Sequence, residues 1–412
     1  MLKNIFPLFL LYLRQISILT EVLQYLQLSI NQMKPSGLYI HIPFCRSKCI
    51  YCDFFSGGDR AADFSRLVDA LLSELAQRKG ELQTVPDTLY IGGGTPSLLP
   101  PSELSRLTEG ITHILGKMND WLEFTLEVNP EDVTEEMCGV WKDAGVNRLS
   151  MGVQSFNDGE LKAIRRRHDA QRAREACGII NRHFDNFSID LMFGLPGQTM
   201  GSWRENVVTA INTGAKHISA YSLMFEEGTP ITVLKEMGKL EFPSEEESVE
   251  MWRFLSERLK AEGFGQYEIS NYAKPGHESV HNSRYWSGNP YLGIGPSAHS
   301  YDGDRIRKAN PCDIKGYLSR YGDGADVSYI YKEESLTDAE LMEESVMLRL
   351  RTREGIDLYE FRHRFGEKAY GRLLANASKQ IERGFLVRDI DRLCLSREGI
   401  MVSDEVIVDL CL

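Results

Sequence analysis

The sequence has neither an excess of basic residues nor an apolar run long enough to cross a membrane. Its 412 residues include 47 Lys and Arg against 59 Asp and Glu, a net charge of -12. That balance argues against nucleic acid as the main partner. The apolar run from Phe6 to Leu13 ends at Arg14 and is shorter than the roughly 20 residues that a spanning helix needs. With Lys3 alone before it and no A-x-A pattern, it is also a poor signal peptide.

Residues 1–33 differ in character from everything after them. We expect an N-terminal extension that reflects either an upstream start, with Met33 as the alternative, or an amphipathic surface helix in peripheral membrane contact. Most of the eight cysteines are irregularly spaced, which is typical of the reduced thiols of a cytosolic protein. We therefore predict a cytoplasmic protein, membrane-associated only through residues 1–33.

Three cysteines form one exception to this irregular spacing. Cys45, Cys49 and Cys52 stand at C-x3-C-x2-C spacing, directly after a strand-like apolar run. One compact loop with this spacing can deliver three thiolates to an iron-sulfur cluster, and a four-iron cubane then keeps one iron open to a small molecule. Structural zinc usually takes four ligands from two C-x2-C pairs, and the chain has no second pair. A disulfide is disfavoured by the odd local count.

The rest of the chain is too long for one ordinary core, unless that core is a barrel with a smaller unit beside it. Between residues 34 and 225, helical periodicity alternates with short apolar strands. The expected strands are 38–42, 88–91, 122–128, 147–152, 187–193 and 217–224. The expected crossover helices are 61–78, 102–117, 134–144, 170–183 and 201–213. Six strands joined in this way predict a partial TIM-type (β/α)6 barrel, whose chemistry gathers at the carboxyl ends of the strands.

Glycines and polar residues stand near several of these strand ends. The glycines of residues 92–94, before Thr95, would let the backbone approach a ligand, although a tight turn would use them too. Glu127, Gln154 and Asp190 lie in the third, fourth and fifth strands, where a polar side chain costs energy unless it finds a partner. A structural hydrogen bond could satisfy any one of them. Three polar side chains at an equivalent depth in the predicted barrel favour a ligand that all three contact.

Two further units follow the barrel. Residues 226–330 contain a helix at 245–262 and then a run rich in Tyr, Gly, Asn and His, which predicts a loop-and-strand lid and connecting region. Residues 331–412 predict a small α+β domain that resembles a winged helix. Its helices are expected at 337–351, 357–366, 370–384 and from 397, with a hairpin at 385–387 and 392–395. Winged helices often bind DNA, but Glu and Asp are interleaved throughout this one. We expect it to cover the barrel mouth.

Six motifs carry a resemblance to a known family. They occur in the order YIHIPFC, GGGTPS, EVNPE, MGVQSF, DLMFGLPGQT and HNSRYW. The cysteine loop resembles the radical S-adenosylmethionine (SAM) signature, in which SAM occupies the open iron and is reductively cleaved. The six motifs together resemble the oxygen-independent coproporphyrinogen III oxidase family, and within it the heme chaperone branch. The resemblance covers the chain from about Gly37 to the C-terminus and implies the same (β/α)6 radical SAM barrel.

The resemblance also implies cofactors and the residues that hold them. Cys45, Cys49 and Cys52 would ligate a 4Fe-4S cluster. His281, which opens HNSRYW, would bind heme, although it could instead only anchor the lid with Asn282. The residues implied in SAM binding are Tyr39, Tyr51, Gly93, Gly94, Thr95, Glu127, Gln154, Arg166 and Asp190. Arg166 lies in an arginine run that could otherwise be a solvated helix face.

One departure from the family pattern bears on function. The oxidases carry a fourth cysteine two positions after the third, and this chain has Phe54 there, following Asp53. Residues 1–33 do not resemble the oxidase's N-terminal region either. The favoured hypothesis is a chaperone that binds heme, passes it to an acceptor protein, and keeps an exchangeable SAM on a 4Fe-4S cluster. The alternative is a radical SAM enzyme that decarboxylates a porphyrin. A nucleic-acid protein acting through the winged-helix-like domain is a third, weaker hypothesis.

Overall fold

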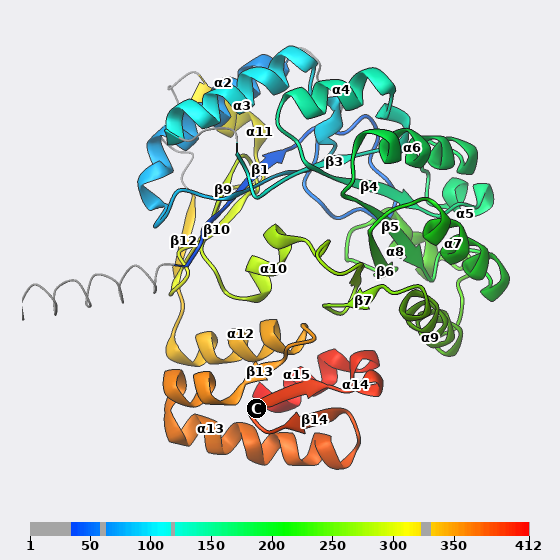
Figure 1. The fold of residues 1–412 in the computed structure, drawn as a ribbon, viewed down its shortest axis with the longest axis vertical. Helices are drawn as coiled ribbons and strands as arrows, with labels where there is room; N and C mark the ends of the chain where they lie inside the picture. Colours follow the sequence, from blue (N-terminus) through cyan, green and yellow to red (C-terminus); the bar gives the residue numbers. More distant parts are fainter. Residues whose placement is uncertain (1–33, 58–62, 117–119, 323–330, 412) are drawn as a thin grey trace, which may run out of the picture.

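One sheet of twelve strands organises most of this computed structural model (Figure 1). The structure describes residues 34–57, 63–116, 120–322 and 331–411. The expectations for residues 1–33 therefore lie outside the described residues. Within the described ranges, no helix combines the length and the apolar character that crossing a membrane requires.

The centre of the sheet is the expected barrel. Six strands pair in parallel in the order of the chain, and this confirms the predicted partial (β/α)6 architecture. They are β1 Gly37–Ile42, β2 Thr88–Gly93, β3 Glu123–Val128, β4 Arg148–Gln154, β5 Phe187–Phe193 and β6 His217–Ser222. The helices among them are α2 Phe64–Arg78, α3 Pro101–Leu115, α4 Glu135–Asp143, α5 Asp158–Ala163, α6 Ala170–His183 and α7 Met200–Asn212. Three short 3-10 turns, Lys79–Glu81, Pro96–Leu98 and Pro130–Asp132, lie among these elements.

Alternation along each strand explains why the barrel has an apolar outer layer and a polar interior. In β3, Phe124 and Leu126 are fully buried in the main core that the helices cover, while Thr125 and Glu127 alternate with them. In β4, Leu149 and Met151 join the same core, and the residues between them are polar or glycine. Successive side chains point to opposite faces of a strand, so each apolar face implies a polar one.

The sheet extends beyond the predicted strands at both edges. β9 (Tyr291–Ile294) pairs in parallel with β1, and β8 (Asn271–Ala273) pairs antiparallel with β6. The strands outside them are β7 Gly265–Gln266, β10 His299–Tyr301, β11 Ile306–Ala309 and β12 Lys332–Ser335. The other elements here are α8 Pro230–Glu236, α9 Glu245–Ala261, α10 Val280–Trp286, α11 Ile314–Tyr317 and a π-helical turn, Leu318–Gly322. Much of the segment expected as a lid thus completes the sheet.

The C-terminal domain has a hydrophobic core of its own. Its elements are α12 Asp338–Leu350, β13 Ile356–Asp357, α13 Leu358–Glu382, β14 Leu386–Asp389, β15 Arg392–Leu395, α14 Arg397–Met401 and α15 Ser403–Cys411. The two helices predicted at 357–366 and 370–384 form α13, which bends at Gly366, where φ is 81°. Three antiparallel strands in the order β13-β15-β14 form the small sheet. The predicted α+β unit is confirmed.

This domain packs against α10 and against the residues between β7 and β8 (Figure 1). The Arg351 guanidinium lies over the Trp286 ring of α10, 5.2 Å from its centroid. The Ile269 amide donates to the Arg351 carbonyl at 3.0 Å, and the Arg353 amide to the Tyr267 carbonyl at 3.0 Å. None of the described residues of this domain lines the pocket at the cysteine loop, so the structure does not support the expectation of a cover over the barrel mouth.

Candidate cofactor and ligand site

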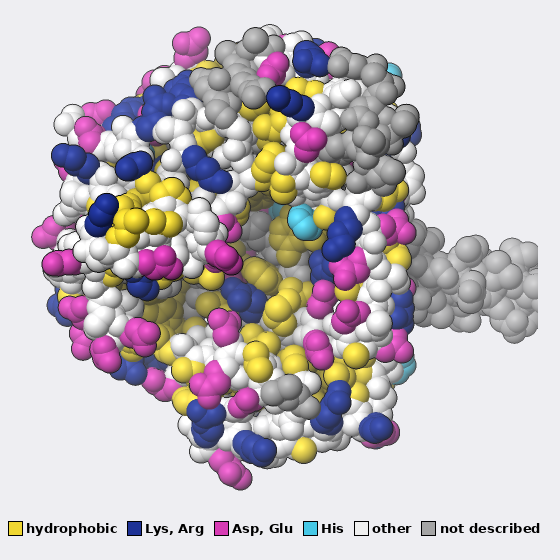
Figure 2. All heavy atoms as spheres, turned by 180° about the vertical axis from the view of Figure 1, so that it is seen from behind, with side chains coloured by type: hydrophobic (Ala, Val, Ile, Leu, Met, Phe, Trp, Pro, Cys, Tyr) yellow, Lys and Arg dark blue, Asp and Glu magenta, His cyan; other side chains and the backbone are white. Residues whose placement is uncertain are grey.

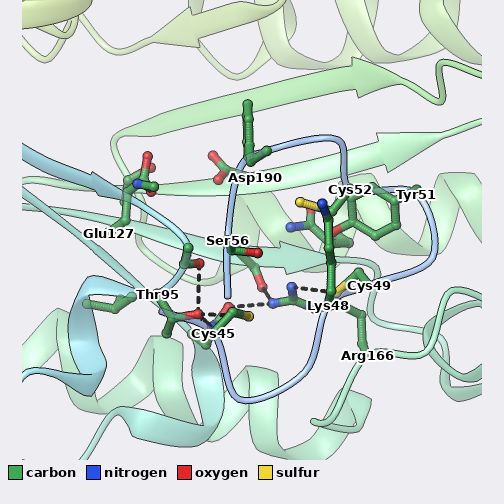
Figure 3. Close-up of a pocket in the computed structure, with 18 of the residues that line it drawn as sticks. Cys45, Lys48, Cys49, Tyr51, Cys52, Ser56, Thr95, Glu127, Arg166 and Asp190 are labelled. Carbon is green, nitrogen blue, oxygen red and sulfur yellow. Dashed lines mark hydrogen bonds between the residues drawn. The ribbon is translucent and has the colours of Figure 1, made fainter. Parts of the chain in front are cut away.

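The carboxyl ends of the barrel strands and the cysteine loop enclose one cavity of about 480 Å³. Its lining draws on the loop after β1, the ends of β2 to β6, and Asn282 of α10. Figure 3 shows the cysteine side chains, Glu127, Asp190 and Arg166 gathered around this space. The residues predicted for the site that line it are Cys45, Cys49, Tyr51, Cys52, Gly93, Gly94, Thr95, Glu127, Gln154, Arg166 and Asp190. Tyr39 and His281 do not line it.

The cysteine loop is tied to the barrel by backbone hydrogen bonds. The Cys45 amide donates to the Gly57 carbonyl at 3.1 Å, and the Cys52 amide to the Cys49 carbonyl at 3.2 Å. All three thiols are free and partly exposed, and burial raises the pKa of Cys52. Thr95 Oγ1 donates to Cys45 Sγ at 3.3 Å, and Arg166 Nη1 lies 3.6 Å from Cys49 Sγ.

These three thiols fit a cluster with one open iron. They come from one loop, line one cavity, and have hydrogen-bond donors beside two of the sulfurs, which is how proteins tune such clusters. Within the described ranges, no three His, Cys, Asp or Glu side chains converge closely enough to hold a single metal ion. A cubane distributes its ligands over several irons and does not need them to meet at one point.

Glu127 is held in place by two donors at the end of β3. Tyr90 Oη donates to Oε1 at 2.8 Å, and the Gly93 amide donates to Oε2 at 3.0 Å. Burial raises the pKa of Glu127 to about 7, against these two hydrogen bonds. Gly93 has φ of 113°, and an added Cβ would lie 2.7 Å from the His41 ring. The glycine therefore allows the backbone to reach the Glu127 carboxylate.

Asp190 and Gln154 lie on the neighbouring strands. Burial raises the pKa of Asp190 to about 6, while hydrogen bonds from Ser219 and Ser150 and the charge of Arg148 oppose that rise. Gln154 ends β4 with φ of 68°, just after a register shift against β5. A left-handed conformation is uncommon for a residue other than glycine and often marks a functional position.

Arg166 is held inside the site, between its exposed neighbours Arg165 and Arg167. Its Nη2 donates to Asn129 Oδ1 at 2.7 Å and also to the Gly152 carbonyl. The alternative of a solvated helix face therefore does not apply to Arg166.

Tyr39 and His281 belong to an aromatic cluster behind Glu127. Tyr39 Oη bonds to His41 Nδ1 at 3.0 Å. His281 is 1% exposed, with Nδ1 at 2.9 Å from Thr88 Oγ1 and Nε2 at 2.8 Å from Tyr285 Oη. Burial lowers the pKa of His281 to about 3. Neither ring nitrogen is free to meet a heme iron in this arrangement, so the role of His281 in heme binding stays a prediction that requires one of these bonds to break.

The cavity also contains residues that the sequence analysis did not assign to the site. Tyr90, Asn129, Arg148 and Asn282 line it. For two of them, strand alternation could have indicated a side chain on the interior face. Tyr90 shares a face of β2 with Thr88, and Arg148 shares a face of β4 with Gln154. Asn129 follows β3, and Asn282 comes from α10, so neither could be placed by strand periodicity.

Comparison with known proteins places the chain in a family. The model of the Radical SAM superfamily matches residues 39–208, and the model of the HemN C-terminal domain matches residues 336–402. "Heme chaperone HemW" of Bacillus subtilis is 36% identical over 378 residues, covering 89% of this chain and 97% of that protein. The chain belongs to the HemW family. "Heme chaperone HemW" of Lactococcus lactis is 33% identical, covering 90% of this chain and 96% of that protein.

A solved structure supports the architecture of this HemW family member. Coproporphyrinogen III oxidase (HemN) from Escherichia coli, described as a radical SAM enzyme, has a TM-score of 0.78 to this chain at 21% identity. The match covers 92% of this chain and 90% of that chain. At this identity the likeness concerns the fold, and it includes the barrel and the C-terminal unit. The resemblance stated from the six sequence motifs is confirmed.

Proposed function

We propose that the protein is a heme chaperone, which binds heme and transfers it to an acceptor protein. The observation that carries the proposal is 36% identity to a curated heme chaperone across 97% of that protein's length. Phe54 in place of the oxidases' fourth cysteine agrees with it.

Cys45, Cys49 and Cys52 would hold a 4Fe-4S cluster, and SAM would bind at its open iron. Once reduced by an external electron donor, the bound cluster would supply the electron for the reductive cleavage of SAM. Thr95 and Arg166 lie against two of the cysteine sulfurs and would orient the loop. Glu127 and Asp190 would pair with the cationic groups of SAM, and the site residues Tyr39, Tyr51, Gly93, Gly94 and Gln154 complete the proposed SAM set. Tyr39 would act from behind Glu127, since it does not line the cavity.

The rim of the cavity offers an apolar surface to a flat macrocycle. Phe54 is 65% exposed and Met224 is 66% exposed, and both line the cavity. Large exposed apolar side chains at a cavity rim are typical of a surface that contacts a ligand or partner. We propose that the heme ring lies against this rim.

The proposed partners are heme and a heme-acceptor protein in the cytoplasm. Figure 2 shows acidic and basic side chains interspersed over one face of the molecule. Together with the net charge of -12, this mixture supports neither DNA nor RNA as a partner. Peripheral membrane contact through residues 1–33 remains part of the proposal for those residues alone.

A second candidate function is porphyrin decarboxylation by radical SAM chemistry. The fold likeness to HemN and the match to the HemN C-terminal domain favour it. The absence of a fourth cysteine at Phe54 disfavours it.

The test is anaerobic reconstitution of the cluster followed by two parallel assays. One titrates heme and follows the Soret band, and the other measures loss of carboxyl groups from coproporphyrinogen III with SAM and a reductant. We expect one heme per chain and no decarboxylation. Robust decarboxylation without heme retention would overturn the proposal in favour of the enzyme.

Two variants locate the axial ligand within the same titration. If His281 coordinates the iron, His281→Ala shifts the Soret band, because loss of an imidazole changes the axial field. Tyr285→Phe is the matched control, since it removes the partner of Nε2 and keeps the imidazole. An unshifted band in His281→Ala removes His281 as the ligand and leaves the chaperone function intact.

A further inference from the structure

Arg148 is a cation inside the barrel that no motif assigns. It is the first residue of β4, and its side chain lies on the interior face, opposite Leu149 and Met151. It is 1% exposed and lines the cavity at the amino-terminal end of β4, the end opposite to that of Gln154. Thr125 is its partner in the register of β3 and β4.

The guanidinium of Arg148 is poorly satisfied. Among the described residues, its one side-chain hydrogen bond runs from Nη1 to Thr125 Oγ1 at 3.4 Å, and Nε is buried without a partner there. Within the described ranges, no carboxylate forms an ion pair with it. A buried charge without a hydrogen-bonded counter-ion is costly and is seldom retained without a role.

Two carboxylates in the surroundings of Arg148, Glu123 and Asp190, are engaged by other donors. Glu123 accepts from the start of α10: from Ser279 Oγ at 3.0 Å and from the amides of Val280 and His281 at 2.7 and 3.0 Å. Asp190 accepts hydrogen bonds from Ser150 and Ser219, and Arg148 acts on it only through its charge. Arg148 is thus left without a carboxylate partner, facing the cavity.

The surroundings favour a single carboxylate as the missing partner. Asn282 lines the same cavity as Arg148, and its side-chain amide can add a neutral hydrogen bond. Glu127 and Asp190 line it as well, and their charges would repel a phosphate dianion more than a carboxylate. Arg166, the other arginine held inside the site, already has Asn129 and the Gly152 carbonyl as partners.

We propose that Arg148 is the cation of a carboxylate-binding subsite at the inner end of the cavity, which receives a carboxylate of the bound ligand. In the heme-chaperone function, on which this assignment rests, the carboxylate is a porphyrin propionate. The carboxylate of SAM has the same chemistry and is the second source.

The test compares ligands with and without the carboxylate, on wild-type protein with its cluster reconstituted anaerobically. The heme pair is iron protoporphyrin IX and its dimethyl ester, and the SAM pair is SAM and decarboxylated SAM. We expect wild-type protein to bind the free-acid heme at least about tenfold more tightly than the ester, since a buried cation gains its counter-ion. The ratio of the affinity for SAM to the affinity for decarboxylated SAM should be the same in the Arg148 variants as in the wild-type protein.

The variants are Arg148→Met and Arg148→Lys. Arg148→Met should bind the acid and the ester of heme equally, and Arg148→Lys should restore part of the preference for the acid. If Arg148→Met instead removes the preference for SAM over decarboxylated SAM, the subsite takes the carboxylate of SAM. Equal binding within both wild-type pairs would overturn the subsite, and this result needs no variant to fold. Failure of wild-type protein to bind either heme would overturn the proposed function, while the SAM pair would still test Arg148.

Discussion

At the scale of single residues, the three loop cysteines differ from the two buried cysteines in what surrounds them. They line a cavity and two of them have polar donors at sulfur, whereas Cys138 and Cys177 are buried among apolar side chains that raise their thiol pKa values. We expect Ala at any one of Cys45, Cys49 or Cys52 to abolish the iron-sulfur absorbance of anaerobically purified protein.

Cys138→Ala is the matched control for this prediction. It removes a thiol from α4, away from the cavity, and should leave iron and sulfide content unchanged. Full iron retention in all three loop variants would contradict the cluster assignment.

The sequence predicted individual site residues where strand alternation and motif agreed. Glu127, Gln154 and Asp190 are polar residues in apolar strands, and the structure places all three on one cavity. The positions of Tyr39 and His281 could not be predicted in this way. The partner of His281 Nδ1 is Thr88, 193 residues away in the chain, and local sequence carries no signal for such a pairing.

At the scale of elements, a buried carboxylate joins α2 to the edge of the sheet that the sequence did not predict. Glu74 is fully buried and accepts four hydrogen bonds. Its Oε1 accepts from Arg78 at 2.7 Å and Asn310 at 2.7 Å, and its Oε2 from the Gly295 amide at 2.9 Å and Tyr317 at 2.7 Å. A fully satisfied buried network of this kind fixes one relative position of the elements it joins.

We expect Glu74→Gln to lower the free energy of unfolding by about 3–5 kcal/mol, because an amide nitrogen would face donors and Arg78 would lose its buried partner. Urea denaturation followed by near-ultraviolet circular dichroism measures the loss. Glu81→Gln is the control: Glu81 pairs with the same arginine, but its side chain is 29% exposed, so the cost should be about 1 kcal/mol or less. Equal losses in the two variants would contradict the role of Glu74.

The elements that the sequence did not predict are those with little local signal. β7 and β8 have two and three residues, and β9 has four, which is too few for alternation to be distinguished from a loop. β9 also takes its place beside β1 through a partner more than 250 residues away. By contrast, α6 at Ala170–His183 was predicted to the residue, because Asp169 caps its start and an apolar stripe runs along its length.

At the scale of the whole molecule, two buried carboxylates give the barrel interior a charge that depends on pH near neutrality. Burial raises the pKa of Glu127 to about 7 and that of Asp190 to about 6, so both side chains are partly protonated below neutral pH. SAM carries an ammonium and a sulfonium group, and a cationic ligand favours the ionised form of a nearby carboxylate. Binding of SAM should therefore release protons whenever the pH lies below these pKa values.

The affinity for SAM should therefore depend on pH mainly below pH 7. Above pH 7 Glu127 is already ionised and the affinity for SAM should be nearly constant. Between pH 7 and pH 6, ionising Glu127 costs about 1.4 kcal/mol per pH unit, so the affinity for SAM should fall by up to about tenfold over that unit. Below pH 6 Asp190 must lose a proton as well, and the fall should be steeper. Isothermal titration calorimetry at pH 6 and pH 8, in buffers of different ionisation enthalpy, measures both the affinity and the protons released.

Glu127→Gln should bind SAM about 1–3 kcal/mol more weakly at pH 8, keep its cluster, and show a smaller pH dependence. An affinity for SAM that is equal at pH 6 and pH 8 in the wild-type protein, with no proton release, would show that neither carboxylate pairs with the ligand.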